Sequence, residues 1–377
     1  MSKNTSGKNK AGLSIPQTLQ DITPQWMSAI MSRQYPGVEV KSVAVSDFIG
    51  HKPNKARVQV DYNAAGKKAG LPGSLFVKGG FKGVKNETAS GIDAGLDIGT
   101  ELELLAYQDL VSHLDVNTPH VYSVIFDRNS YNGIVVMEDL SSSNATFMKQ
   151  SPGLSYAQAV AFVDALARIH APWLNSAALA TGGLFGPTSS LAERSARLQN
   201  GYLDLMATTP RWGDYVAAPR GAAVPRMFQD AGRIAAAQKK MNELHQACAR
   251  TVVHGDEHLG NLYFDANGKP GFIDWCARIE PWVISVSYFL VVTLDVFDRR
   301  HWERSLLTLY LERLALYGAT APSFEEAWLM YRCTMLYPFL VWFINSAKWQ
   351  PEAVNTRNTV RGAQAMMDHD VFNLLGV

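Results

Sequence analysis

The residues best suited to chemistry lie in one segment, Thr251–Trp275, which carries His254, Asp256, Asn261 and Asp274. In phosphoryl transfer, one Asp is needed beside the acceptor hydroxyl, and an Asn with a second Asp holds Mg²⁺ against the nucleotide phosphates. The order and spacing of these four side chains therefore favour phosphoryl-transfer chemistry.

The local pattern predicts that these side chains come together. Val252 and Val253 form an apolar run before a sharp turn, and a strand–turn–strand unit follows at Leu262–Phe264 and Gly271–Ile273. The ends of the loop and of the hairpin then meet at one place, where oxygen ligands suit Mg²⁺. A solvated loop with incidental acids is the alternative. The turn at 265–269 could also suggest a calcium loop, but it lacks the later Glu ligand.

The motif His254-Gly255-Asp256-x-His258-x-x-Asn261, followed by Ile273-Asp274-Trp275, resembles the catalytic signature of the aminoglycoside phosphotransferase and choline kinase superfamily. Within it, the chain is most similar to the ecdysteroid-kinase-like branch. The similarity includes Leu166–Ala171 and Glu138–Leu140, and it covers residues 15–375. It implies a bilobal, protein-kinase-like α+β fold, with an antiparallel-sheet N-lobe, a mainly helical C-lobe and ATP in the cleft between them.

The resemblance also assigns roles by position. Asp256 would accept or orient the proton of the attacking hydroxyl, and Asn261 and Asp274 would bind Mg²⁺. His254 would shape the loop through hydrogen bonds. The His254 and His258 pair also suggests Zn²⁺, but the residues between them do not form HExxH.

A kinase-like N-lobe needs a cation on the ATP phosphates and an acid that holds this cation. Lys78 ends an apolar strand and suits the first role, while Glu103, on a predicted helix, suits the second. Glu101 is the competing acid. A lone lysine is often only a solvated charge, but the strand before Lys78 and the helical acid after it favour the functional interpretation.

The adenine site is expected in the link 136–140. Backbone groups of Glu138 and Leu140 would pair with adenine, while Met137 packs on the ring or in the core. Gly50 lies in the turn expected to cover the phosphates, although this turn has no GxGxxG pattern. No GxxxxGK[ST] occurs either, which excludes a P-loop NTPase.

One residue departs from the resembled family. Ser285 stands where relatives usually carry an Asp that braces the catalytic loop. A serine can hydrogen-bond there but brings no charge, so a non-catalytic nucleotide-binding pseudokinase is the rival prediction. An unrelated helical hydrolase would need a GxSxG nucleophile elbow, which does not occur.

Composition fits a two-lobed globular enzyme. The chain has 377 residues, of which 47% are hydrophobic and 18% charged, and its net charge of +1 suggests neither nucleic acid nor a membrane as partner. Cys248, Cys276 and Cys333 show no pairing pattern and fit a reducing compartment. Because no secretory signal opens the chain, we expect a cytoplasmic protein.

We expect a disordered tail at 1–14, an ATP-binding N-lobe at 15–137, and a helical C-lobe with the catalytic loop and acceptor site at 138–377. The apolar runs Val283–Leu294 and Met335–Ile344 are too short to cross a bilayer, and we expect buried helices there. Gly79–Gly99 is expected as a glycine-rich loop. The N-lobe pattern predicts a helix pair over 16–34, strands at Val38–Ile49, Ala56–Tyr62, Leu75–Lys78, Val121–Phe126 and Gly133–Met137, and a helix at Thr100–His113.

The sequence does not name the acceptor. Acids and bases are about balanced over 141–377, without the acidic cluster that a polycationic aminoglycoside needs. The region is rich in aromatic residues, which either form helix core or line the acceptor pocket: Trp282, Trp328, Tyr331, Tyr337, Phe339, Trp342, Phe343 and Trp349. The second alternative favours a neutral or apolar hydroxylated small molecule, such as a steroid, a terpenoid or another secondary metabolite. An aminoglycoside or a choline-like cation is the other candidate. The oligomeric state and the choice of ATP over GTP stay open.

Overall fold

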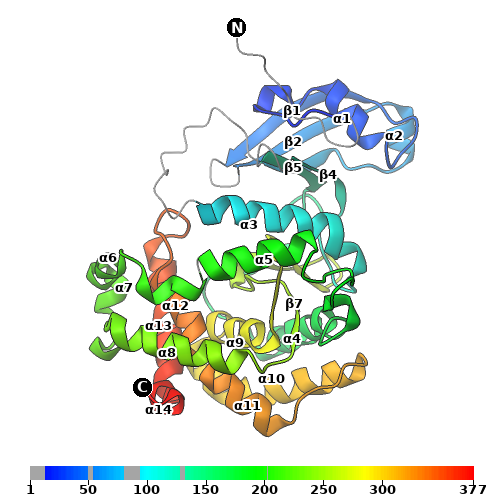
Figure 1. Ribbon diagram of the computed structural model, residues 1–377. Helices are drawn as coiled ribbons and strands as arrows, with labels where there is room; N and C mark the ends of the chain where they lie inside the picture. The colour runs from blue at the N-terminus through cyan, green and yellow to red at the C-terminus, as the bar shows by residue number, and fades with distance from the viewer. Residues whose placement is uncertain (1–12, 50–53, 80–93, 128–131, 202) are drawn as a thin grey trace. The chain divides into compact units, whose positions relative to one another are not determined.

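The computed structural model describes residues 13–49, 54–79, 94–127, 132–201 and 203–377 (Figure 1). Its internal contacts divide the chain into two compact units. The first unit takes in the chain as far as His113 together with Thr118–Ala145, and the second takes in Leu114–Asn117 and Thr146–Val377. The first unit therefore extends to Ala145, past the boundary expected after Met137.

The first unit is built on a five-stranded antiparallel sheet with the strand order β1-β2-β3-β5-β4. Alternation explains why these segments are strands: along β2, every second side chain from Asn54 to Tyr62 is buried. All five strands predicted from the sequence are confirmed, with ends that differ by at most two residues. The strands are β1 (Val40–Ile49), β2 (Asn54–Tyr62), β3 (Ser74–Gly79), β4 (Val121–Asp127) and β5 (Asn132–Glu138).

The helices of the first unit complete its core. Helix α1 (Pro24–Met31) lies within the predicted helix pair over 16–34 and begins at Pro24, with the Thr23 side chain accepting the Trp26 N–H as an N-cap. The short helix α2 (Ala64–Lys68) was not predicted. The helix expected at Thr100–His113 begins earlier, as α3 (Ala94–Leu105). It then becomes a π-helical turn at 106–110 and a 3-10 turn at 111–113.

The start of α3 falls within the predicted glycine-rich loop Gly79–Gly99, so the loop prediction is wrong for its last residues. Residues 80–93 of that loop lie outside the described residues. The expected tail at 1–14 also lies almost entirely outside them.

The second unit is mainly helical and carries two small sheets. Strand β7 pairs with β10, and β6, β8 and β9 form a three-stranded sheet whose β8–β9 hairpin was predicted. The strands are β6 (Thr146–Phe147), β7 (Arg250–Val253), β8 (Leu262–Phe264), β9 (Pro270–Phe272) and β10 (Arg278–Pro281). The helices are α4 (Tyr156–His170), α5 (Ser190–Gly201), α6 (Trp212–Ala217), α7 (Pro219–Ala222), α8 (Ala231–His245), α9 (Trp282–Thr293), α10 (Val296–Leu316), α11 (Phe324–Cys333), α12 (Leu336–Phe343), α13 (Glu352–Asp368) and α14 (Val371–Leu375).

Two of these helices are apolar on every side. Every residue of α9 is buried, as is nearly every residue of α12, and both correspond to the apolar runs that the sequence predicted as buried helices. Within the described ranges, no helix combines the length and the apolar character needed to cross a membrane. Strand β10 runs directly into α9 and pairs with β7, which leads into the predicted catalytic loop. The β7–β10 pair therefore positions both α9 and the loop.

Candidate active site

Strand β7 leads directly into the predicted catalytic loop. It pairs with β10, with Val253 opposite Arg278. Gly255 follows with a φ of 89°, and a Cβ atom there would lie 2.2 Å from the Cys276 carbonyl oxygen. Only glycine fits this turn, which fixes the direction in which the chain enters the loop.

His254 is fully buried against the rings of Phe272 and Trp275. Burial lowers the pKa of this imidazole to about 4, so the ring is neutral at physiological pH. Its Nδ1 accepts the Asp256 N–H at 3.2 Å, which leaves the proton on Nε2 to be donated to the Ile273 carbonyl at 2.9 Å. The histidine therefore joins the catalytic loop to the segment just before Asp274.

Asp256 presents its carboxylate to solvent while its oxygens are held from several sides. The Tyr288 hydroxyl donates to Oδ1 at 3.0 Å, and the Asn261 amide donates to Oδ2 at 3.1 Å. The His258 Nε2 lies 3.5 Å from Oδ2, and its Nδ1 accepts the Gly260 N–H. The side chain remains 37% exposed. The acid is thus fixed in position and still accessible to a small molecule.

Asn261 and Asp274 are the predicted metal ligands. The Asn261 Nδ2 also donates to the Asp256 carbonyl at 2.8 Å, so the amide oxygen is the atom left to bind a cation. The Ile273 N–H donates to the Asn261 carbonyl at 3.0 Å, which ties the chain before Asp274 to the loop. Asp274 has a φ of 57°, a left-handed conformation that is uncommon for a residue other than glycine and often marks a functional site.

Among the residues that the structure describes, no three or more His, Cys, Asp or Glu side chains gather to hold a metal ion. A Mg²⁺ site of the predicted kind does not need such a group. One Asp, one Asn, water and the nucleotide phosphates complete its oxygen shell. The oxygen donors present at Asn261 and Asp274 therefore fit Mg²⁺ in type.

Sequence reasoning missed three residues that hold the loop: Glu257, Arg278 and Tyr288. Tyr288 lies on α9 and is 3% exposed, and burial together with the Asp256 charge raises its pKa, so the hydroxyl stays a donor. Its polar tip in an otherwise apolar helix was the available signal. Glu257 and Arg278 are also buried, and their partners include Ser285 and Tyr337, which are distant in the sequence.

In the first unit, the structure brings together Lys78 and Glu103. The Lys78 Nζ lies 2.6 Å from the Glu103 Oε1, and the two residues are 3% and 5% exposed. Of the two acids considered from the sequence, Glu103 is therefore the one that meets the lysine. The ion pair joins β3 to α3 and holds a buried ammonium group in one place.

Some backbone groups of the predicted adenine link are already hydrogen-bonded within the protein. The Glu138 N–H donates to the His120 carbonyl at 2.8 Å, and the Leu140 carbonyl accepts the N–H groups of Ser143 and Ala145 at 3.3 Å. These two groups are engaged inside the protein, so an adenine ring would have to use the Glu138 carbonyl and the Leu140 N–H. Met137 is buried, as expected. Gly50, predicted to cover the phosphates, lies outside the described residues.

Asp139 anchors this link to the sheet. Its carboxylate accepts hydrogen bonds from Ser141 and Ser74 and pairs with Arg57 at 2.8 Å. Burial alone would raise the pKa of Asp139, but these hydrogen bonds and the guanidinium charge hold it below its usual value. The carboxylate is thus a structural anchor that fixes the chain between Glu138 and Leu140.

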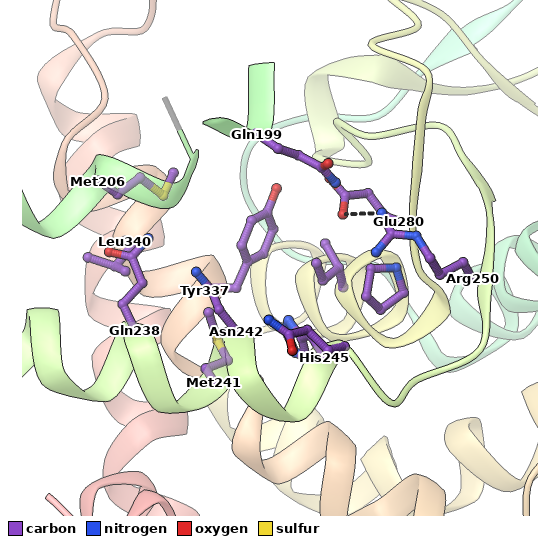
Figure 2. Close-up of a pocket in the computed structure, with 13 residues that line it drawn as sticks. Gln199, Met206, Gln238, Met241, Asn242, His245, Arg250, Glu280, Tyr337 and Leu340 are labelled. Atoms are coloured by element: carbon purple, nitrogen blue, oxygen red, sulfur yellow. Dashed lines mark ion pairs between the residues drawn. The ribbon is translucent and has the colours of Figure 1, made fainter. Parts of the chain in front are cut away.

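A pocket of about 420 Å³ lies within the second unit, with α8 and α12 among its walls (Figure 2). This volume is typical of small-molecule sites. Arg250 and Glu280 are its charged residues, with Nη2 and Oε2 4.0 Å apart. The Tyr337 hydroxyl accepts a hydrogen bond from Arg278 at 2.9 Å. The pocket is lined by Gln199, Met206, Gln238, Met241, Asn242, His245, Gln246, Arg250, Glu280, Pro281, Ile284, Tyr337 and Leu340.

The aromatic residues predicted either as core or as pocket lining are mostly core. Tyr337 is the member of the set that lines this pocket, and Trp349 is 38% exposed. The helix-core interpretation is therefore correct for most of the set. The buried members are Trp282, Tyr331, Tyr337, Phe339, Trp342 and Phe343.

Residues 98–283, just under half of the chain, match the model of a phosphotransferase enzyme family. No curated protein matches the chain. Among solved structures, the choline kinase LicA from Streptococcus pneumoniae is 14% identical, with 91% of this chain and 98% of that chain covered and a TM-score of 0.46.

Two further solved structures show the same level of similarity. Choline kinase from Cryptosporidium parvum is 11% identical, with 95% and 93% of the chains covered and a TM-score of 0.48. An aminoglycoside phosphotransferase from Streptomyces rimosus, in complex with ADP and streptomycin, is 16% identical, with 75% and 90% covered and a TM-score of 0.40. These scores are too low to carry an argument.

The family match supports a phosphotransferase, an enzyme that transfers a phosphoryl group. The mixed α+β architecture, with its antiparallel sheet in the first unit and helices in the second, agrees with that class and with the sequence prediction. Nothing in the match distinguishes the ecdysteroid-kinase-like branch, which stays a prediction.

Proposed function

We propose that this chain is an ATP- and Mg²⁺-dependent O-phosphotransferase that phosphorylates a hydroxyl group of a small molecule. One observation carries the proposal: the accessible Asp256 carboxylate is fixed by Tyr288 and Asn261 at the end of β7. An acid held in this way orients an attacking hydroxyl, which is most of what phosphoryl transfer requires of a protein.

In the proposed reaction, the acceptor oxygen forms a bond to the γ-phosphorus of ATP while the bond from that phosphorus to the ADP oxygen breaks. The acceptor proton passes to Asp256. Bound Mg²⁺ would neutralise charge on the phosphates, held through the Asn261 amide oxygen and Asp274. Lys78, held by Glu103, would supply a further positive charge to the phosphates. Met137, the Glu138 carbonyl and the Leu140 N–H are the proposed adenine contacts.

For the acceptor, we propose a neutral hydroxylated molecule, with a steroid, terpenoid or similar secondary metabolite as the class to test first. The pocket in the second unit has one carboxylate and one guanidinium, and its other polar lining comes from amides, one imidazole and one phenol. A polycationic aminoglycoside would call for several carboxylates. Since all three cysteines are described and form no disulfide, we also propose that the enzyme is cytoplasmic.

The test is mass spectrometry of a metabolite extract incubated with the protein, Mg²⁺ and ATP labelled with ¹⁸O in the γ-phosphate. A labelled phosphate ester is expected with the wild type and should also identify the acceptor. Asp256→Asn should lower turnover by about 10³-fold or more while nucleotide binding is kept. Asp298→Asn, a matched change on α10 in the same unit, should leave turnover unchanged.

The same experiment separates the two classes of function. Labelled product formed equally fast by the wild type and by Asp256→Asn would show that Asp256 is not the catalytic base. Nucleotide binding without any labelled product, across extracts of different origin, would establish the non-catalytic nucleotide-binding protein instead. Labelled product only on amino sugars or choline would overturn the proposed acceptor class.

A further inference from the structure

Glu257 is a buried acid directly beside the proposed catalytic Asp256, and it is 1% exposed. Its Oε1 accepts two hydrogen bonds, from the Gly255 N–H at 3.1 Å and from the Ser285 hydroxyl at 2.5 Å. Burial holds the pKa of Glu257 above its usual value, although the two hydrogen bonds and the charge of Arg278 act in the opposite direction. Two donors on one oxygen and a guanidinium nearby are the surroundings of a carboxylate.

Gly255 is held at both of its backbone groups by these buried side chains. Its N–H donates to Glu257, and its carbonyl accepts a hydrogen bond from the Arg278 guanidinium at 3.0 Å. Its φ of 89° is a conformation that glycine alone adopts easily. Because Asp256 follows immediately, the peptide on its N-terminal side cannot rotate without breaking one of these contacts.

Ser285 lies on α9, one turn before Tyr288, and both side chains reach the loop. Tyr288 donates to the Asp256 carboxylate, and Ser285 donates to the Glu257 carboxylate. The serine hydroxyl can orient an acid but cannot provide a charge of its own. Helix α9 therefore contacts the loop through hydroxyl donors, and the carboxylates that accept these hydrogen bonds belong to the loop.

We infer that Glu257 is a positioning residue for phosphoryl transfer: together with Ser285 it supplies, from the loop, the negative charge that position 285 lacks. This inference rests on the proposed function. The carboxylate acts through Gly255 and Asp256 and does not touch the acceptor or the nucleotide. The uncharged Ser285 is then no sign of a non-catalytic protein, because the neighbouring Glu257 provides the negative charge.

The test moves the carboxylate from position 257 in the loop to position 285 on α9. Glu257→Ser should lower kcat by about 10²-fold, the scale expected when a reacting group is misplaced by about 1 Å, while the KM for ATP changes little. The exchange variant Glu257→Ser with Ser285→Asp is smaller than the wild type by one methylene group in total and returns a carboxylate from α9. It should recover at least about tenfold in kcat over Glu257→Ser.

A second measurement tests the positioning role of Glu257 and does not depend on enzymatic activity. Glu257→Gln keeps the shape of the side chain and removes only its charge, so it should fold normally. Hydrogen exchange of the Gly255 and Asp256 amides should then be at least about tenfold faster than in the wild type. As a control, Glu303→Gln changes another buried glutamate of the second unit, paired with Arg299, and should leave exchange at Gly255 unchanged.

The outcomes separate this inference from the proposed function. Unchanged exchange at Gly255 in Glu257→Gln would overturn the positioning role, as would an exchange variant that folds and is no more active than Glu257→Ser. If the wild type transfers no phosphate to any acceptor but Glu257→Gln still loosens Gly255, the proposed function fails while the loop-holding role stands.

Discussion

His170, His245 and His254 are buried histidines that stay neutral in the folded protein. Burial lowers their pKa values to about 3, about 4 and about 4, respectively. The ring of His170 hydrogen-bonds to the Tyr310 hydroxyl at 2.8 Å, and its carbonyl accepts from Thr251 at the start of β7. His170 therefore ties α4 to β7, the strand that leads into the predicted catalytic loop.

These histidines predict acid sensitivity. An unfolded histidine takes up a proton near pH 6.5, whereas the folded side chains do so only near pH 3–4. The unfolded state therefore binds more protons between these values, and the stability contribution, complete above pH 6.5, is lost as the pH falls toward 4. Urea denaturation at pH 7.5, 6 and 5 should show a falling free energy of unfolding. His170→Gln should reduce this slope, and His301→Gln, an exposed control, should not.

A second prediction at the residue scale concerns Tyr288. Its hydroxyl donates to the Asp256 Oδ1, so Tyr288→Phe removes one hydrogen bond to the proposed catalytic base and leaves the ring packing intact. We expect kcat to fall by about tenfold with the KM for ATP nearly unchanged, as measured by steady-state kinetics. Tyr317→Phe removes a hydroxyl that holds Asp164, away from the loop, and serves as the control. Equal kcat in the two variants would contradict the role given to Tyr288.

Among the elements, α7, α12 and α13 are joined by one buried arginine. Arg220, 2% exposed, pairs with Glu352 at the start of α13 and donates to the carbonyls of Trp342, Phe343 and Asn345 at the end of α12. These carbonyls lie at or just beyond the last turn of α12, so the guanidinium binds a helix terminus and a carboxylate together.

Arg220→Met is therefore expected to lower the free energy of unfolding by about 3–5 kcal/mol, because it leaves a carboxylate and several carbonyls without their donor. Arg300→Met removes an ion pair between Arg300 and Asp368 at the surface and should cost about 1 kcal/mol or less. Chemical denaturation of both variants measures the difference. A similar decrease in the free energy of unfolding in the two variants would show that the Arg220 contacts do not stabilise the packing of α7, α12 and α13.

At the scale of elements, the sequence predicted what depends on local pattern. Short runs of strand-forming residues between turn signals predicted the five strands of the first unit, and continuous apolar runs predicted α9 and α12. It did not predict α2, which is one short turn of helix capped by Asn63. It also missed β10, because this strand carries a buried arginine and glutamate whose burial depends on β7 and on each other.

At the scale of the whole molecule, the sequence predicted the residues of the catalytic loop but not the distant residues that hold it. The spacing of His254, Asp256 and Asn261 placed them in one loop, and their hydrogen bonds to each other are local enough to be expected. The residues that hold this loop come from β10 and α9, and no spacing rule connects them with the motif. Their roles could be assigned only once the fold had brought Arg278 and Tyr288 to the loop.

Lys78 and Asp274 are two of the proposed nucleotide contacts. ATP with Mg²⁺ should raise the melting temperature of the wild type, because a ligand that binds only the folded state stabilises it. Lys78→Met and Asp274→Asn should each reduce this rise, whatever they do to the melting temperature without ligand. Lys67→Met, an exposed lysine of α2, is the control and should keep the full rise. An undiminished rise in Lys78→Met would remove the lysine from the nucleotide site.

The contact between Glu257 and Ser285 also constrains how such a chain can change over generations. A descent from an ancestor with an acid at 285 could lose that acid first, gain Glu257 first, or change both at once. The first order passes through a protein with no carboxylate beside Gly255, whereas the second passes through one with two, which repel but still hold the turn. Selection for activity would favour the second order. Sequences of this kind should therefore show an acid at one of the two positions, occasionally at both, and rarely at neither.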